Sequence, residues 1–150
     1  MNSDQLTSIL RGALGSKFKG VYAADATLPQ ATSYPYGFVV NTDPSSKPGK
    51  HWQAIWCVNN AEAEFFDSFG DPTMRDNIKN YLSKYKKIEK NLKKIQKNYE
   101  TSCGPHVVYF LLKRNLGVSF RNIINSLENR QFADVFVKFF VSNLIINGPI

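Results

Sequence analysis

One segment constrains the fold of this chain more than any other: the apolar run from Val107 to Leu112, which follows Ser102-Cys103-Gly104-Pro105. Ser102 suits an N-cap and Pro105 suits the first turn of a helix, so we predict a helix from Cys103 to about Asn115. Its apolar side chains point in several directions, and such a helix is usually buried on all sides. We therefore expect the rest of the chain to pack around it.

The first residue of this predicted helix is a cysteine, Cys103. Free backbone N–H groups and the positive end of the helix dipole favour a thiolate there, which lowers the pKa of the thiol. Gly104 adds no bulk beside the sulfur, and the same amides can donate to an oxyanion. A buried structural cysteine at a helix start is the alternative interpretation.

A thiol that attacks a carbonyl needs a base, a group that orients the base, and oxyanion donors. His51, Asp67 and Gln96 precede Cys103 in that order and are one candidate for each role. The only other histidine, His106, is an alternative base, since helical side chains lean toward the N-terminus and therefore toward Cys103. Gln96 alone is an unremarkable glutamine among lysines.

A predicted hairpin brings the base and the acid together. The strand-like runs 51–58 and 64–69 are separated by a polar turn at Asn59-Asn60. If residues 58–60 form the loop, His51 lies opposite Asp67, and opposed residues have Cβ atoms about 5 Å apart. A register slip of one residue would turn Asp67 to the other face. Glu64 and Asp71 are therefore the fallback acids.

The remaining pattern predicts a single domain, residues 1–150, of the α+β class, with a small mainly antiparallel sheet packed against the central buried helix and further helices. Residues 86–97 fit either a helix continuation or an exposed strand. Between residues 131 and 144 one stripe of large apolar residues indicates core or a partner contact. The other expected elements are a helix after Ser3 that stops at Gly15, a strand at 36–40, a surface loop at 41–50, a helix from about 71 to 82 and a short helix at 119–127.

Charge is concentrated in one segment of a chain whose net charge is +7. A local basic stripe fits contact with the phosphates of DNA, although a solvated surface face explains it as well. Few aromatic residues interleave the lysines, so base stacking is poorly supported. The lysines of this stripe are Lys84, Lys86, Lys87, Lys90, Lys93, Lys94 and Lys97.

Composition excludes several classes of protein. The chain is 43% hydrophobic and 13% aromatic, which argues against disorder. No apolar run reaches the roughly 18 residues of a membrane span, and the first residues lack the pattern of a signal peptide. Two cysteines are too few for a disulfide scaffold, and we interpret Cys57 as a small core residue. Neither a zinc-ligand spacing nor a glycine-rich phosphate loop is present, so no cofactor is expected.

The motifs together resemble the adenovirus-type maturation cysteine proteases (adenain-like), which share a clan with the SUMO-deconjugating proteases. The order of the four parts carries the resemblance, which covers roughly residues 5–115. The matching segments are Phe18-Lys19-Gly20-Val21, residues 37–42, His51-Trp52 followed by Ala54, residues 65–70, Gln96 and Ser102-Cys103-Gly104.

This resemblance implies an α+β protease in which His51 is the base, Asp67 its orienting acid, Cys103 the nucleophile and Gln96 an oxyanion donor. It implies processing of capsid or other virion precursor proteins, and a location in the virion and in the host cell cytoplasm or nucleus. Stimulation by DNA and by an activating peptide is also implied. No cysteine lies between Cys57 and Cys103, so we expect any such peptide not to be covalently tethered.

In composition and length the chain resembles members of this family from virophages or polinton-type elements.

Three other functions stay open at this point. An isopeptidase of ubiquitin-like modifiers would cleave after Gly-Gly in a folded modifier, and an acyltransferase would depend on acetyl-CoA. A basic nucleic-acid-binding virion protein that kept a protease-like fold would depend on the lysines and not on Cys103.

Overall fold

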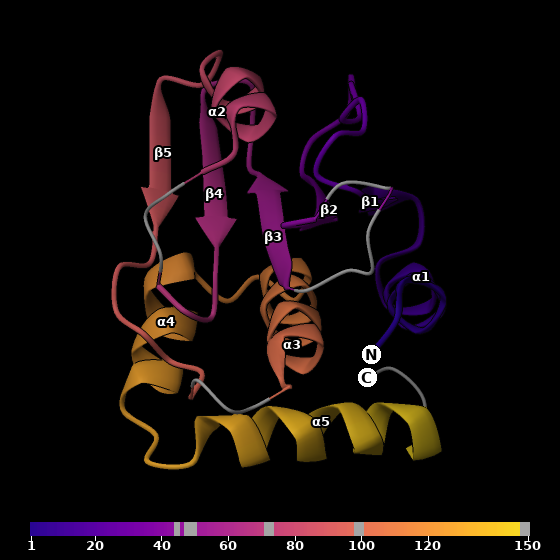
Figure 1. Cartoon of the computed structure of the whole chain (residues 1–150), viewed down its shortest axis with the longest axis vertical. Coiled ribbons are helices and arrows are strands. Elements are labelled where there is room, and N and C mark those ends of the chain that lie inside the picture. The colour runs from indigo at the N-terminus through magenta and orange to yellow at the C-terminus, as the bar shows by residue number, and fades with distance from the viewer. Residues whose placement is uncertain (44–45, 47–50, 71–73, 98–100, 148–150) are drawn as a thin grey trace.

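A five-stranded sheet with helices on both faces forms the protein (Figure 1). The computed structural model describes residues 1–43, 46, 51–70, 74–97 and 101–147. No helix within these ranges is long and apolar enough to cross a membrane. The elements are α1 (Ser3–Leu14), η1 (Gly15–Lys17), β1 (Phe18–Tyr22), β2 (Tyr36–Asn41), β3 (Trp52–Cys57), β4 (Glu62–Phe66), α2 (Asp76–Leu82), β5 (Lys87–Lys90), α3 (Cys103–Asn115), α4 (Phe120–Glu128) and α5 (Ala133–Asn147).

The predicted α+β class is confirmed, and the sheet is more mixed than expected. Strands follow the order β1-β2-β3-β4-β5. The two central pairs, β2 with β3 and β3 with β4, are antiparallel, whereas β1 with β2 and β4 with β5 are parallel. The second parallel pair arises because α2 lies between β4 and β5, and a strand that follows a crossover helix returns in the same direction.

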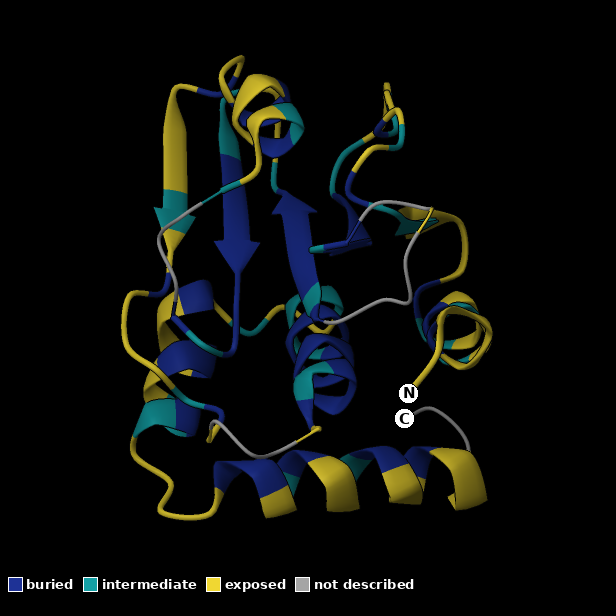
Figure 2. Cartoon of the chain, in the orientation of Figure 1, coloured by how far each residue is buried: buried dark blue, intermediate teal, exposed yellow. Residues whose placement is uncertain are grey.

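Side chains alternate across the sheet and divide the core in two. Val39, Ala54, Trp56 and Phe66 face α1, α3, α4 and α5. The intervening residues of the strands, Cys57 among them, pack with α2 on the other face. The predicted central helix is α3, and nine consecutive residues of it are buried, Gly104 to Leu112 (Figure 2).

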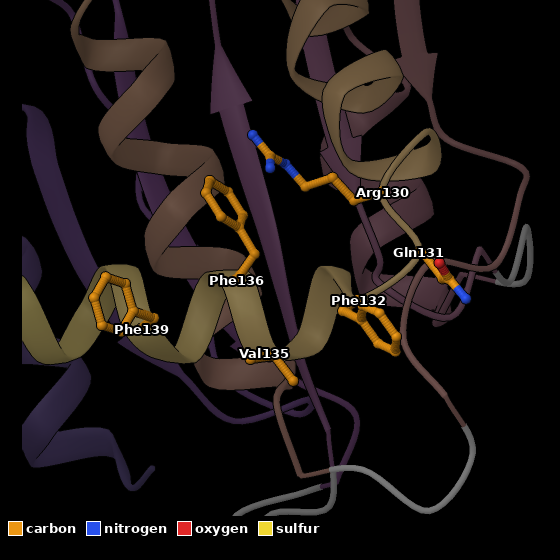
Figure 3. Close-up of a pocket in the computed structure, with 6 residues that line it drawn as sticks. All are labelled: Arg130, Gln131, Phe132, Val135, Phe136 and Phe139. Carbon is orange, nitrogen blue, oxygen red and sulfur yellow. The ribbon is translucent and has the colours of Figure 1, made fainter.

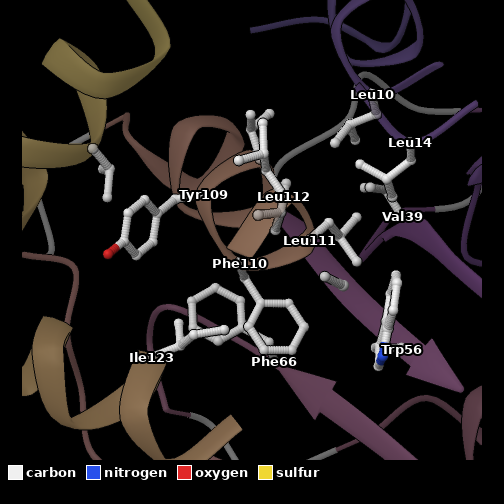
Figure 4. Packing of buried hydrophobic residues seen from close by; sticks show 14 of the residues in the cluster. Leu10, Leu14, Val39, Trp56, Phe66, Tyr109, Phe110, Leu111, Leu112 and Ile123 are labelled. Atoms are coloured by element: carbon white, nitrogen blue, oxygen red, sulfur yellow. The ribbon is translucent and has the colours of Figure 1, made fainter. Parts of the chain in front are cut away.

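Phe110 lies at the centre of the packing between α3 and the sheet (Figure 4). Its ring stacks on Phe66 with centroids 4.8 Å apart and meets the edge of Phe120 at 5.8 Å. Phe110 is fully buried. One side chain thus joins α3, β4 and α4, so the position of the sheet relative to the helix that begins at Cys103 depends on it.

The hairpin between β3 and β4 has a different register from the one expected. Cys57 pairs with Ala63 and Ala54 with Phe66, so position 53, and not 51, continues opposite 67. The loop lies one residue further along the chain because the Asn59 side chain accepts hydrogen bonds from the amides of Ala61 and Glu62. Each residue of β4 therefore lies opposite a β3 residue two positions from the expected one. A shift of two residues leaves every side chain on its expected face.

The apolar stripe between residues 131 and 144 is divided between core and surface, since Phe136 and Phe140 pack against the core whereas Phe132, Val135 and Phe139 are exposed. The buried residues of α5 are Ala133, Asp134, Val137, Val141 and Leu144. A hollow on the outer surface is lined by Arg130, Gln131, Phe132, Val135, Phe136 and Phe139 (Figure 3). The Arg130 guanidinium lies 3.6 Å from the centre of the Phe136 ring. This hollow is therefore a surface feature of α5.

Residues 87–90 of the ambiguous lysine segment form the exposed edge strand β5, so the helix alternative is wrong. Lysines on an edge strand hinder pairing with another sheet, which gives them a structural reason to be there. Lys87 forms an ion pair with Glu89, and Lys84 lies over the Tyr81 ring. The end of the segment, by contrast, turns inward and buries Asn91 and Gln96.

Candidate active site

Cys103 begins α3, as the sequence predicts, and the residue is partly exposed. Ser102 occupies the N-cap position, but its hydroxyl makes no capping hydrogen bond and donates instead to Asp134. The amides of the first turn are therefore not taken up by a cap. The sulfur accepts hydrogen bonds from the backbone amides of Trp52 and Gly104, which favour a thiolate.

The contact between residue 104 and Met1 leaves room only for a glycine at this position. A Cβ atom on this residue would lie 2.7 Å from the Cβ of Met1. The carbonyl of Met1 accepts a hydrogen bond from the Trp52 indole at 3.0 Å. Trp52 and Gly104 therefore hold Met1 next to Cys103, and a larger residue at 104 would displace it.

His51 and Asp67 are in direct contact. The His51 Nε2 donates to Asp67 Oδ1 at 2.7 Å, and the ring stacks on Phe69 with centroids 4.4 Å apart. Cys103 acts on the same ring, since a hydrogen bond with Cys103 and the Cys103 charge both raise the pKa of His51. His51 thus connects the carboxylate to the thiol, which is the arrangement a general base needs.

Three residues besides His51 fix the position of Asp67. Gln53 donates to its Oδ2 at 2.7 Å, and the backbone amide of Phe69 donates to Oδ1 at 2.8 Å. Asn91 holds its backbone at both ends, since the carboxamide accepts from the Asp67 amide and donates to the Asp67 carbonyl. The carboxylate therefore has a single orientation, toward His51.

These contacts shift the pKa values of all three groups. Burial alone lowers the pKa of His51, but the hydrogen bonds to Asp67 and Cys103 and the Asp67 charge raise it to about 9. Burial raises the pKa of Cys103, yet the His51 hydrogen bond, the two amides and the His51 charge bring it below its ordinary value. The pKa of Asp67 is also lowered, because its hydrogen bonds outweigh its burial. Both the raised pKa of His51 and the lowered pKa of Cys103 favour an imidazolium–thiolate pair.

Gln96 is 1% exposed and lies in the loop that follows β5. Its Oε1 accepts from the Ser68 hydroxyl at 2.6 Å, so the N–H groups of the carboxamide point away from Ser68. The amides of Ile95 and Gln96 both donate to the Ser68 carbonyl. The turn after β4 therefore holds the Gln96 loop. The role of Gln96 as an oxyanion donor stays a prediction.

Two of the alternatives from the sequence, Glu64 and His106, lie outside this site. Glu64 binds Arg114 through two hydrogen bonds of 2.7 and 3.0 Å, so it is not the acid of His51. Asp71 lies outside the described residues. His106 is fully buried and bonded to Asp134 at 2.9 Å, which directs its ring away from the role of base.

Sequence reasoning missed the residues that support the site, Gln53, Ser68, Asn91 and Asp134. Gln53 could have been found, since it lies two residues after His51 and so on the same strand face. No sequence signal indicated Asn91 or Asp134, which approach from distant segments. Within the described residues no group of three or more potential metal ligands occurs.

Comparisons of sequence and of structure both find the S273R cysteine protease of African swine fever virus. No protein-family model matches the chain. A stretch of 103 residues is 31% identical to the "Cysteine protease S273R" of African swine fever virus (isolate Tick/Malawi/Lil 20-1/1983). It is 30% identical to the "SUMO-1 cysteine protease S273R" of the isolate Tick/South Africa/Pretoriuskop Pr4/1996. The match covers 61% of the present chain and 38% of the viral protein, so the chain spans well under half the length of these relatives.

The fold is shared over a longer stretch than the sequence similarity. The crystal structure of the African swine fever virus pS273R protease superposes with a TM-score of 0.56 at 18% identity. The match covers 91% of this chain and 65% of that protein. The chain therefore has the fold of the pS273R protease, and 61% of its length is similar in sequence to the S273R cysteine proteases.

Proposed function

We propose that the protein is a cysteine endopeptidase that processes viral protein precursors, with Cys103 as nucleophile and His51 as base. The observation that carries this proposal is the continuous contact from Asp67 through His51 to Cys103 at the start of a buried helix. The similarity to the S273R cysteine proteases supports it. Capsid or other virion precursors as substrates follow from the resemblance to the adenovirus-type enzymes.

In this mechanism the Cys103 thiolate attacks the carbonyl carbon of the scissile peptide. Amides at the start of α3, together with Gln96, donate to the oxyanion that forms. The C–N bond then breaks as the His51 imidazolium gives its proton to the leaving amine, which leaves a thioester on Cys103. A water molecule, deprotonated by His51, attacks the thioester and releases the acid, and the imidazolium–thiolate pair is restored.

Alkylation by iodoacetamide between pH 4 and pH 9 tests the activated thiol. The lowered pKa of Cys103 keeps more of the thiol as thiolate than in an ordinary cysteine, so alkylation should stay fast below pH 8. In His51→Ala the hydrogen bond and the charge are lost, and we expect the rate at pH 6 to fall by about 10-fold or more because the thiol returns toward its ordinary pKa of about 8.5. Mass spectrometry measures the extent of alkylation of Cys103 and of Cys57 separately.

Cys57 is the internal control in the same experiment. Burial raises the pKa of the Cys57 thiol, and the residue is fully buried. It should react slowly at every pH in both proteins. A Cys103 that reacts no faster than a free thiol, and is unchanged by His51→Ala, would contradict the proposed nucleophile.

A second candidate is a protease of SUMO-like modifiers, because one relative is named SUMO-1 cysteine protease. A SUMO-1 fusion cleaved after Gly-Gly is compared with an unfolded peptide that carries the same residues on both sides of Gly-Gly. An endopeptidase should hydrolyse the two with similar kcat/KM. A modifier protease should favour the fusion strongly, since it gains binding energy from the folded modifier. A Cys103→Ala protein is the blank for both.

Binding of DNA through the lysines of the basic stripe, and activation by a peptide that is not covalently tethered, also stay proposals. Support for DNA is the exposure of β5, where Lys87 and Lys90 lie on the open edge of the sheet. The same proposal locates the protein in the virion and in the host cell cytoplasm or nucleus. An origin in a virophage or polinton-type element rests on composition and length alone.

A further inference from the structure

A buried carboxylate on α5 joins the two loops that the proposed mechanism uses. Asp134 is 5% exposed. Its Oδ1 accepts from the Ser102 hydroxyl and from His106 Nε2 at 2.9 Å, and its Oδ2 accepts from the backbone amide of Lys97 at 3.1 Å. These partners are 28 to 37 residues away along the chain. The carboxylate therefore bridges segments that the sequence keeps apart.

The partners of Asp134 are next to the two groups that act on the substrate carbonyl. Ser102 directly precedes Cys103, and Lys97 directly follows Gln96. His106 lies one turn further along α3, so its bond to Asp134 fixes the rotation of that helix about its axis. We propose that Asp134 is a positioning residue that sets the distance between the Cys103 sulfur and the Gln96 carboxamide. This inference rests on the proposed function.

The chemistry of the cluster suits a charged carboxylate. Burial raises the pKa of Asp134, but the hydrogen bonds from Ser102, His106 and the Lys97 amide bring it below its ordinary value. Burial keeps the pKa of His106 low, so the ring is neutral and donates through Nε2. Three donors thus converge on two carboxylate oxygens. An amide in place of the carboxylate retains one acceptor oxygen and adds donors where donors already point.

Loss of Asp134 should affect the acylation of Cys103 and not its ionisation. Asp134 has no hydrogen bond to His51 or Cys103 among its described contacts, so its loss should leave the thiolate populated. What changes is the separation of sulfur and oxyanion donors, and a displacement of about 1 Å can cost about 100-fold in rate. Acylation by a peptide needs that geometry. Alkylation by iodoacetamide forms no oxyanion, so it does not need that geometry.

The experiment compares these two reactions of Cys103 in Asp134→Asn. The acylating probe is a peptide amide ending in Gly-Gly with a fluorescent amine as leaving group, followed in the pre-steady state. We expect acylation to slow about 10- to 100-fold, while alkylation at pH 6 changes less than about threefold. Val135→Ala, an exposed neighbour on the same helix, is the matched control and should alter neither rate.

Ser102→Ala keeps the test decisive if Asp134→Asn does not fold. It removes one donor to the carboxylate and should slow acylation in the same direction by a smaller factor, again with alkylation retained. Unchanged acylation in folded variants would make Asp134 merely structural. An equal loss in both reactions would mean that it acts on the thiol itself, which overturns the positioning role. A wild-type protein that alkylates slowly and is not acylated would instead overturn the proposed function, and this inference with it.

Discussion

Asp67→Asn should lower kcat for hydrolysis of a Gly-Gly peptide by about 10³- to 10⁴-fold, because an asparagine lacks the negative charge that stabilises the His51 imidazolium. Asp67 Oδ1 accepts from His51 Nε2, and the carboxylate charge contributes to the raised pKa of His51, about 9. Without that charge the pKa of His51 falls. Both the thiolate and the proton for the leaving amine are then less available near neutral pH. Steady-state kinetics across pH 5 to 9 measures the loss.

The pH profile adds a signature that a simple loss of folding would not give. In the wild type, hydrolysis should rise through the lowered pKa of Cys103 and decline as the pH passes the His51 pKa of about 9, where the imidazolium is lost. In Asp67→Asn the upper limb should move to lower pH, since the histidine loses its proton earlier.

Glu64→Gln is the matched control for this experiment. Glu64 is a buried acid like Asp67 and lies on β4, three residues before it. It was a fallback acid on sequence grounds, and it binds Arg114 rather than His51. Its replacement should lower stability and leave the pH profile in place. If Glu64→Gln moved the upper limb and Asp67→Asn did not, the assignment of the acid would be wrong.

Phe110→Ala should reduce the free energy of unfolding by about 3–5 kcal/mol, the usual cost of removing a buried phenylalanine from a well-packed core. Phe110 is fully buried and contacts Phe66 and Phe120 through its ring. Since α3, β4 and α4 meet at this side chain, the cavity has walls from three elements and cannot close by a shift of one. Urea denaturation followed by circular dichroism measures the difference.

Phe139→Ala is the corresponding control, with the same deletion on a residue that is 67% exposed. Its effect should stay within about 0.5 kcal/mol, as is usual for surface substitutions. Comparable losses in the two variants would mean that the outer face of α5 is covered in solution. A loss in Phe110→Ala below about 1 kcal/mol would show that the core around α3 is less tightly packed than the structure indicates.

Local patterns in the sequence were sufficient for several elements. Ser119 caps α4 through the amide of Asn122, and Gly15 ends α1 with a positive φ of 61°. The central burial of α3 followed from its apolar run alone, since such a helix is stable only when other elements cover every side. In each case the determining interactions lie within a few residues of one another, so the chain order contains them.

The hairpin shows where such reasoning reaches its limit. The predicted pairing of positions 51 and 67 was wrong by two residues, because the Asn59 side chain draws the loop toward Glu62. Asp67 still contacts His51, since β4 ends at Phe66 and Asn91 clamps the residue that follows. The contact thus owes its geometry to a side chain 24 residues further on.

What the sequence determined by itself was the α+β class, the buried helix with a cysteine at its start, and a short set of residues able to do thiol chemistry. Tertiary structure decided which acid faces His51, which face of α5 is buried, and that Asp134 links Ser102 to the Gln96 loop. The physical reason is one of range. Helix caps, turns and hydrophobic periodicity act between neighbours in the chain, whereas the orientation of a buried carboxylate depends on donors that only the packed fold brings within hydrogen-bond distance.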